Sequence, residues 1–585
     1  MTKRKNIIWW LALVLGLILV NYIASKAHSR YDLTEEKRYS LTATTHNLLK
    51  TIDNDLDIEV FLKGDLPAQF RKLSTVSQEF LSTLREVNPS RVHYRFIDPL
   101  DEADDNRKWG DSLQSLGATP INLSVQVKAG QQSNILYPYA LIHFNGQTEL
   151  VNLFQTSRRD ITVSELNNAE AMMEYQFVKT IDRMLHPDKP LVAYAIGNKE
   201  PTGANVFSLR QTIDPTTVPQ NINQYFNPAD KSKYQLVLFN LATQPSIPDT
   251  FKVLVIVKPD SAFNDAEKLK IDQYLMRGGK VMWFIDNLYA EPDSLSIKSQ
   301  LIAYDRNLYL QDLLFHFGVR INPDLVMDLQ CDVLPFVVGG SRADPQYEFL
   351  KWNYYPLFGS RNNHIINKNL GLVAGRFVNS IDTTESEGIR KTFLLQSSSN
   401  SRTITTPALI SPNENRNAPE DALFRKDGIP VAVLLEGTFS SFFKSRIPKA
   451  QKDSLQQYGG FRENSSDEAK MIVVADGDIV LNDVSSNGPL PMGMNLFTLE
   501  KQPEYLLANR DFLLNSLEYL TSKTSIIQTR NKEIVLRLLD MKKVESEKTK
   551  WQFITIALPI LLVIIFGLIY QQIRRYRFSK KAASY

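Results

Sequence analysis

Each end of the chain carries a long apolar segment without a charged residue. Residues 7–24 read IIWWLALVLGLILVNYIA, and residues 553–570 read FITIALPILLVIIFGLIY. A helix of this length spans ~27 Å, close to the ~30 Å hydrocarbon core of a bilayer. The sequence therefore predicts two transmembrane helices with one large region between them.

Basic residues lie on the outer side of both apolar segments. They are Lys3, Arg4 and Lys5 before the first segment, and Arg574, Arg575, Arg577, Lys580 and Lys581 after the second. Because basic flanks favour the cytoplasmic side, we expect a two-pass protein of the bacterial inner membrane, with cytoplasmic termini and periplasmic main domains. A cleaved signal peptide is the alternative for the first segment. The basic tail also suits anionic lipids of the inner membrane.

Composition excludes several classes of function. The chain has 67 Lys and Arg against 64 Asp and Glu, whereas nucleic-acid binders usually carry a strong basic excess, so we expect no nucleic-acid partner. Its single cysteine, Cys331, excludes an intramolecular disulfide and cysteine-rich zinc sites. The sequence contains no HExxH pattern and no GxxxxGK[ST] phosphate loop. We therefore expect no metal, no cofactor and no ATPase activity.

Two α/β domains are predicted between the apolar segments. In the first, strand patterns at 57–62 and 92–97 enclose a helical pattern at 70–87, which predicts a thioredoxin-like βαβ domain. In the second, apolar strands such as 191–196 and 253–257 alternate with helices, which predicts a doubly wound, flavodoxin-like sheet.

A long segment without helical periodicity interrupts the second domain and predicts a β- and loop-rich insertion. The predicted order along the chain is an anchor (1–26), a first α/β domain (27–188), a second α/β domain (189–328 and 467–525) with its insertion (329–466), a membrane-proximal helix (526–552), a transmembrane helix (553–570) and a basic cytoplasmic tail (571–585).

Polar residues follow three of the predicted parallel strands. They are Asn198, Lys199 and Glu200 after the first strand, Asp286 after another, and Asp476 and Asp478 after the strand that returns from the insertion. Ligands of open α/β sheets bind outside the carboxyl ends of the strands, so these six residues form the candidate ligand site. The two last aspartates could hold a hydroxyl group or a cation, and Glu200 a sugar hydroxyl or a peptide amine. An ordinary turn and a loop-bonding glutamate are the structural alternatives, which the pattern favours.

Five segments resemble, in this order, auxiliary proteins encoded with ABC transporters. They are RYSLT at 38–42, LVAYAIGNKEP at 191–201, NDAEKLKIDQYLMRGGKVMWFID at 264–286, TFLLQSSSNSRTITTPALI at 392–410 and MIVVADGDIVLND at 471–483. With the two apolar ends and the length, they resemble the gliding-motility-associated auxiliary subunits of the GldG family. The resemblance implies a substrate-binding-like subunit that partners a polytopic permease and a separate ATPase and acts in gliding motility.

The resemblance also implies that the second domain is related in fold to class I glutamine amidotransferases, which carry a nucleophilic cysteine on a strand-to-helix turn. Cys331 lies in DLQCDVLPF, which has neither a glycine-rich elbow nor a following helix, and no GxSxG elbow supplies a serine. We therefore expect a non-catalytic subunit. The alternatives are a membrane-anchored periplasmic hydrolase or glycan-modifying enzyme that uses Glu200, Asp286 or Asp476, and a purely structural scaffold. A homo-oligomer is a further option.

Overall fold

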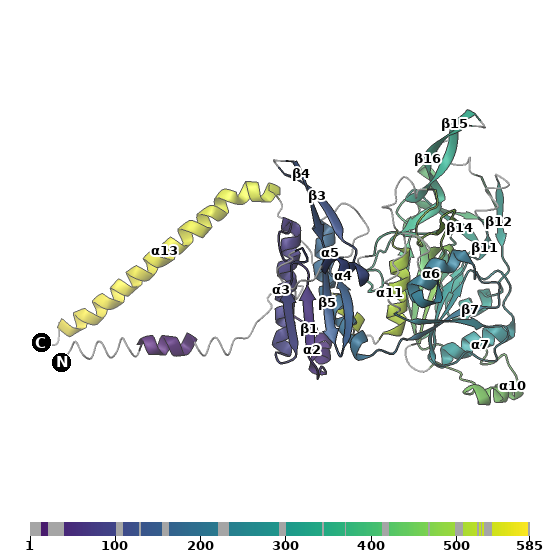
Figure 1. Cartoon of the computed structure of the whole chain (residues 1–585), viewed down its shortest axis with the longest axis horizontal. Coiled ribbons are helices and arrows are strands. Elements are labelled where there is room, and N and C mark those ends of the chain that lie inside the picture. Colours follow the sequence, from purple (N-terminus) through teal and green to yellow (C-terminus); the bar gives the residue numbers. More distant parts are fainter. Residues whose placement is uncertain are drawn as a thin grey trace. The chain divides into compact units, whose positions relative to one another are not determined.

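The computed structural model divides the chain into two compact units, Met1–Glu533 and Ile534–Tyr585 (Figure 1). The structure describes residues 13–21, 40–100, 109–127, 130–154, 163–219, 233–291, 300–341, 344–368, 370–411, 421–465, 469–497, 507–522, 526–527, 529–531 and 541–582.

The first α/β domain begins with a helix capped by its own sequence. The Thr42 hydroxyl accepts the backbone N–H of Thr45 at the start of α2 (Ala43–Lys50). Strand β1 (Leu56–Val60), helix α3 (Ala68–Val87) and strand β2 (Val92–Phe96) follow, and β1 pairs with β2 in parallel. The predicted βαβ unit is therefore confirmed.

Two antiparallel strands complete the sheet of this domain, which has the order β2-β1-β5-β6. They are β5 (Tyr139–Phe144) and β6 (Gln147–Asn152). Helices α3 and α5 (Val163–Leu185) pack through one apolar core that includes Phe70, Leu81 and Phe177. A separate cluster joins α4 (Trp109–Ser115) to Phe61 and Leu141, and β3 (Ile121–Val127) and β4 (Gly130–Leu136) form their own hairpin.

The second α/β domain is built on a seven-stranded sheet with the order β19-β22-β23-β10-β9-β7-β8. The strands are β7 (Leu191–Ile196), β8 (Gln235–Asn240), β9 (Phe251–Val257), β10 (Lys280–Phe284), β19 (Ile389–Gln396), β22 (Pro430–Gly437) and β23 (Ala469–Val474). The neighbours β8, β7, β9, β10 and β23 are parallel. Numbered along the chain, these five have the order 2-1-3-4-5 of one class of doubly wound sheets.

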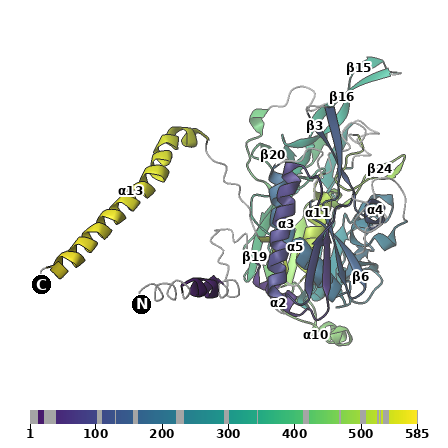
Figure 2. The same ribbon diagram turned by 60° about the vertical axis from the view of Figure 1, so that its left-hand side comes forward.

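Helices pack against both faces of this sheet. Figure 2 shows the helices of the first domain, α3 and α5, next to each other. One core joins the sheet to α6 (Phe207–Ile213) and α11 (Asn509–Thr521), and the other joins it to α7 (Asp265–Met276) and α9 (Gln311–His316). Because both faces are buried, the strands read as continuous apolar runs. This is why the sequence predicts them well.

The predicted insertion is not wholly separate from the sheet. Strands β19 and β22, which the sequence assigns to it, extend the sheet by antiparallel pairing of β22 with β23 and of β19 with β22. Other strands between β10 and β23 form smaller sheets, and the four of them within residues 288–328 precede the predicted insertion. They are β11 (Leu288–Tyr289), β12 (Leu301–Asp305) and β21 (Ala408–Ile410); β13 (Val319–Ile321) and β18 (Ile381–Thr383); β14 (Asp324–Asp328) and β20 (Ser401–Thr405); and the long hairpin β15 (Cys331–Ser341) and β16 (Asp344–Phe358) with β17 (Val373–Ala374).

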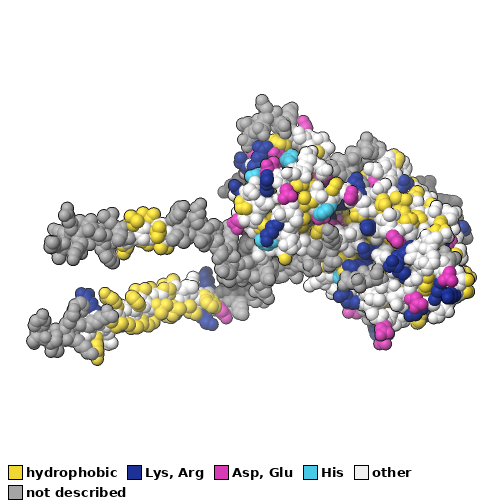
Figure 3. All heavy atoms as spheres, turned by 90° about the horizontal axis from the view of Figure 1, so that it is seen from below, with side chains coloured by type: hydrophobic (Ala, Val, Ile, Leu, Met, Phe, Trp, Pro, Cys, Tyr) yellow, Lys and Arg dark blue, Asp and Glu magenta, His cyan; other side chains and the backbone are white. Residues whose placement is uncertain are grey.

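The C-terminal unit is dominated by one helix, α13 (Met541–Ala582), which contains the predicted span 553–570. Within its residues Glu547–Tyr576, an 18-residue window has a mean hydropathy of 2.8 and no buried share, and this is the one helix of the described residues that is long and apolar enough to cross a membrane. Figure 3 shows hydrophobic side chains along it, with basic ones near both ends of the apolar stretch. Of the first predicted span, residues 13–21 are helical and exposed, and the rest lies outside the described residues.

The predicted membrane-proximal helix is only partly seen. Its residues 541–552 are the first turns of α13 itself, and Thr529–Asn531 form the short helix η8. Residues 532–540 lie outside the described part of the chain.

Candidate functional site

Three of the six predicted site residues meet at the carboxyl edge of the central sheet. Asp286 follows β10, and Asp476 and Asp478 follow its parallel neighbour β23. Carboxylate oxygens of the three lie within 4.8 Å of one another. Backbone N–H groups help to hold them, since Gly477 donates to Asp286 Oδ1 at 2.5 Å and Asp478 donates to Asp476 Oδ1 at 2.7 Å.

Lys258, which the sequence analysis did not single out, supplies the cation of this cluster. Its Nζ lies 2.8 Å from Asp478 Oδ1 and 3.1 Å from both Asp286 Oδ2 and Glu291 Oε2. The ammonium donates hydrogen bonds to Glu291 and to both carboxylate oxygens of Asp478, while Asp286 contributes an ion pair. Burial alone would lower the pKa of Lys258, but these carboxylates raise it well above its usual value.

The turn after β23 lies close to Lys258 and has a glycine at the point of contact. A Cβ atom at Gly477 would lie 2.6 Å from Lys258 Cβ, so only glycine fits at this position without a shift. Lys258 itself has φ +44°, and Lys199 at the same sheet edge has φ +60°. Left-handed backbone in residues other than glycine is costly and clusters at functional sites.

Two arginines from the segment between β10 and β23 flank the cluster. Arg306 donates to Asp260 Oδ1 and to Glu291 Oε1, both at 2.6 Å. The Arg376 guanidinium forms a two-pronged ion pair with Asp483, with N–O distances of 2.6 and 2.9 Å. The sequence analysis missed both arginines, because their approach to the sheet edge depends on long-range docking.

Asp476 is the carboxyl group of the cluster that most favours its protonated form. Burial, followed by the nearby Asp286 and Asp478 carboxylates, raises the pKa of Asp476 well above its usual value. The three aspartates are the described residues that could hold a metal ion together. The Lys258 ammonium already contacts two of them, however, and its charge would oppose a second cation there.

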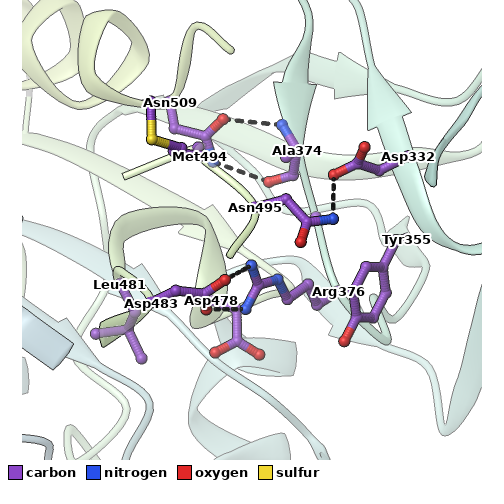
Figure 4. Close-up of a pocket in the computed structure, with 12 residues that line it drawn as sticks. Asp332, Tyr355, Ala374, Arg376, Asp478, Leu481, Asp483, Met494, Asn495 and Asn509 are labelled. Carbon is purple, nitrogen blue, oxygen red and sulfur yellow. Dashed lines mark hydrogen bonds and ion pairs between the residues drawn. The ribbon is translucent and has the colours of Figure 1, made fainter. Parts of the chain in front are cut away.

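A small polar cavity adjoins the cluster (Figure 4). Its volume is about 20 Å³, and its lining includes Tyr355, Arg376, Asp478, Asp483 and Asn495. Such a volume holds about one water molecule. A sugar or a peptide would therefore require this edge of the sheet to open.

The other three predicted residues form a neighbouring network after β7. The Asn198 N–H donates to Glu200 Oε2 at 2.8 Å, and Asn198 Nδ2 donates to Glu267 Oε2 at 3.1 Å. Lys199 is exposed. Burial raises the pKa of Glu200 to about 7. Glu200 thus hydrogen-bonds its own loop, as the structural alternative to a ligand-binding role predicts.

The network is linked to the aspartate cluster. The Asn198 carbonyl accepts the N–H of Asp260 at 2.8 Å, and Asp260 pairs with Arg306.

Cys331 lies at the start of the β15–β16 hairpin, away from any strand-to-helix turn. Its thiol is buried, and burial raises its pKa to about 12. Because the thiolate is the nucleophilic form, a thiol with this pKa is a poor nucleophile at neutral pH.

Comparisons with known proteins give two family matches. A family described as an ABC-type uncharacterized transport system matches residues 189–516. A family described as a domain of unknown function (DUF7088) matches residues 35–143. None of the curated proteins matches the chain.

Solved structures are similar only at a low level. The N-terminal domain of mmIFT52 is 12% identical with a TM-score of 0.29, covering 57% of this chain and 98% of its own. The exo-beta-1,4-mannosidase Op5Man5 from Opitutaceae bacterium strain TAV5 is 9% identical with a TM-score of 0.22, covering 60% and 39%. Scores this low carry no argument about fold or function.

Proposed function

The chain belongs to the family of ABC-type uncharacterized transport systems, and from this membership we propose a specific role within its transporter-associated, accessory function. The protein is a non-catalytic, substrate-binding-like subunit of the GldG type, which acts in gliding motility. Its partners are a polytopic permease and a separate ATPase. It is a two-pass protein of the bacterial inner membrane with its α/β domains in the periplasm.

One observation carries the non-catalytic part of the proposal. Ligands of α/β folds usually bind at this edge of the sheet. Here it is occupied by charged side chains of the protein, with Lys258 between Asp286, Glu291 and Asp478. Only about 20 Å³ is free in the adjoining cavity. A closed, charge-compensated edge supports recognition through protein surfaces better than chemistry on a small substrate.

Features of the first domain and of α13 support the finer parts of the proposal. The strand order β2-β1-β5-β6, with one parallel pair, supports a thioredoxin-like first domain. The apolar stretch of α13, with basic residues beyond it, supports a membrane span and contact with inner-membrane lipids.

The direct test is purification of the full-length chain in mild detergent, followed by mass spectrometry of what accompanies it. We expect a polytopic permease and its ATPase, and an ATPase rate that changes when this subunit is added in the presence of cargo. A homo-oligomer without either partner would contradict the association. Identical ATPase rates with and without this subunit would indicate that it is a purely structural scaffold. A Cys331→Ser variant should behave as the unmodified chain.

One observation favours a second candidate, a membrane-anchored hydrolase or glycan-modifying enzyme. Glu200 titrates at about 7, near the operating pH that suits a general acid or base. If this reading is correct, Glu200→Gln abolishes function while association with the transporter persists. Retained function in that variant would exclude it.

A further inference from the structure

Helix α5 of the first domain holds the segment that follows the N-terminal apolar region. Glu174 Oε1 accepts the Thr42 N–H at 2.8 Å, the Thr42 hydroxyl at 2.9 Å and also the Thr45 hydroxyl. Thr42 is the N-cap of α2. The Glu174 side chain therefore ties the start of α2 to α5.

The next residue of α5 holds the segment that leads to the other apolar helix. The Arg530 guanidinium lies over the Tyr175 ring, 5.5 Å from its centre, and both residues are buried. Arg530 also donates to the Lys368 carbonyl at 3.1 Å. Arg530 belongs to η8, the last described turn before α13. Successive residues of a helix point about 100° apart, so Glu174 and Tyr175 can serve two partners.

One turn further along, α5 is tied to the second domain. Lys179 Nζ lies 2.6 Å from Glu518 Oε2 of α11, and it donates to the Tyr175 hydroxyl at 3.2 Å. Glu518 is buried, and although burial opposes it, the Lys179 charge holds the pKa of Glu518 below its usual value. Breaking such a buried pair is costly, because it leaves an uncompensated charge.

We propose that Glu174, Tyr175 and Lys179 make α5 a clamp that couples the two membrane-connected segments to each other and to the second domain. The proposal rests on the proposed function, in which both ends of the chain enter the membrane beside a permease. A packed helix moves as a unit, so a displacement of η8 is transmitted to the start of α2. A change in the state of the transporter would then shift the start of α2 and η8 together.

Hydrogen exchange of the full chain in lipid nanodiscs tests the α5 clamp without permease or ATPase. An Arg530→Met variant loses the contact with Tyr175. We expect roughly 3- to 30-fold faster exchange in η8 and also in α2, the range that loss of a buried cation–π contact gives. Glu174→Ala should produce the reciprocal effect, with faster exchange in η8 as well as in α2.

Controls separate transmission from general loosening. Lys268→Met removes a buried lysine on α7, which pairs with Asp312 at 2.9 Å, and should leave the exchange of α2 and η8 unchanged. If Arg530→Met does not fold, Arg530→Lys keeps the charge but loses the guanidinium over the Tyr175 ring, and should give a smaller change in both segments. Faster exchange confined to the substituted segment would overturn the clamp. Absence of transporter partners, by contrast, would overturn the proposed function and leave this readout intact.

Discussion

At the scale of single residues, Lys258 is the side chain on which the carboxyl edge most depends. Lys258→Met keeps most of the volume but removes the charge that lies within 3.1 Å of three carboxylates. We expect a loss of about 3–5 kcal/mol in the free energy of unfolding at pH 7, the usual result of breaking a buried charge network. Urea unfolding of the full chain in detergent measures it.

Acid should partly rescue this variant. Without Lys258, the aspartates would have raised pKa values in the folded state, so they favour folding when protonated and oppose it as the pH rises. The deficit should therefore shrink between pH 7 and pH 5. Lys268→Met is the matched control, because the side chain of its partner Asp312 is about half exposed and water can solvate its charge. Equal losses for the two variants at both pH values would contradict the role given to Lys258.

Glu200 predicts a second pH dependence of the same sign, here in the unmodified chain. Its pKa is raised from 4.5 to about 7. A raised folded-state pKa means that its contribution is fully present below pH 4.5 and is lost as the pH rises through 7. Glu200→Gln should remove this dependence. Between pH 4.5 and pH 8, the free energy of unfolding of the variant should therefore rise by about 2–3 kcal/mol relative to that of the unmodified chain. Parallel pH–stability curves for the two proteins would contradict the burial argument.

At the scale of elements, residues at the two ends of helix α7 determine where the helix begins and where it ends before β10. Asn264 and Glu267 form a capping box at the start of α7, and Gly278 after its end has φ +93°. Gly279 is required for another reason, since a Cβ there would lie 2.4 Å from the Tyr274 ring. Gly279→Ala should lower the free energy of unfolding by about 1–3 kcal/mol, the range for overpacking a buried site. A urea midpoint equal to that of the unmodified chain would refute this.

The elements of the second domain differ in how far sequence could predict them. Strands β7, β9 and β10 are apolar because both sheet faces are covered, so their composition reveals them. Strand β22 has the same apolar character, whereas β19 is more polar. Nothing near them in the sequence indicates that β22 pairs with β23 and β19 with β22.

The candidate site follows the same division. The rule that parallel strands end at one edge brings Asp286, Asp476 and Asp478 together, as predicted. Lys258 also directly follows a buried strand, so the same rule places it at this edge. No sequence pattern places Arg306 and Arg376 at this edge, because their contacts depend on how the segment between β10 and β23 packs against the sheet.

At the scale of the whole molecule, α13 connects the question of topology to that of function. Its 42 residues correspond to ~63 Å, about twice the ~30 Å hydrocarbon core of a bilayer. Five Lys and Arg residues follow its apolar stretch, against four lysines within residues 541–552 before it. Because positive-inside sorting depends on Lys and Arg and gives Asp and Glu little weight, this small excess favours the cytoplasm for the end after the stretch.

Cysteine accessibility can test this orientation, because the chain has only Cys331 and that thiol is buried. In a Cys331→Ser background, we expect Ser546→Cys to react with a membrane-impermeant maleimide in cells whose inner membrane is intact. Ser579→Cys and Thr2→Cys should react only after that membrane is disrupted, since two spans return both termini to the cytoplasm. Labelling of the Ser579→Cys variant in intact cells would reverse the orientation of α13. Labelling of Thr2→Cys together with Ser546→Cys, but not of Ser579→Cys, would leave α13 in place but remove the first span. The proposed coupling through α5 would then have one membrane segment to transmit instead of two.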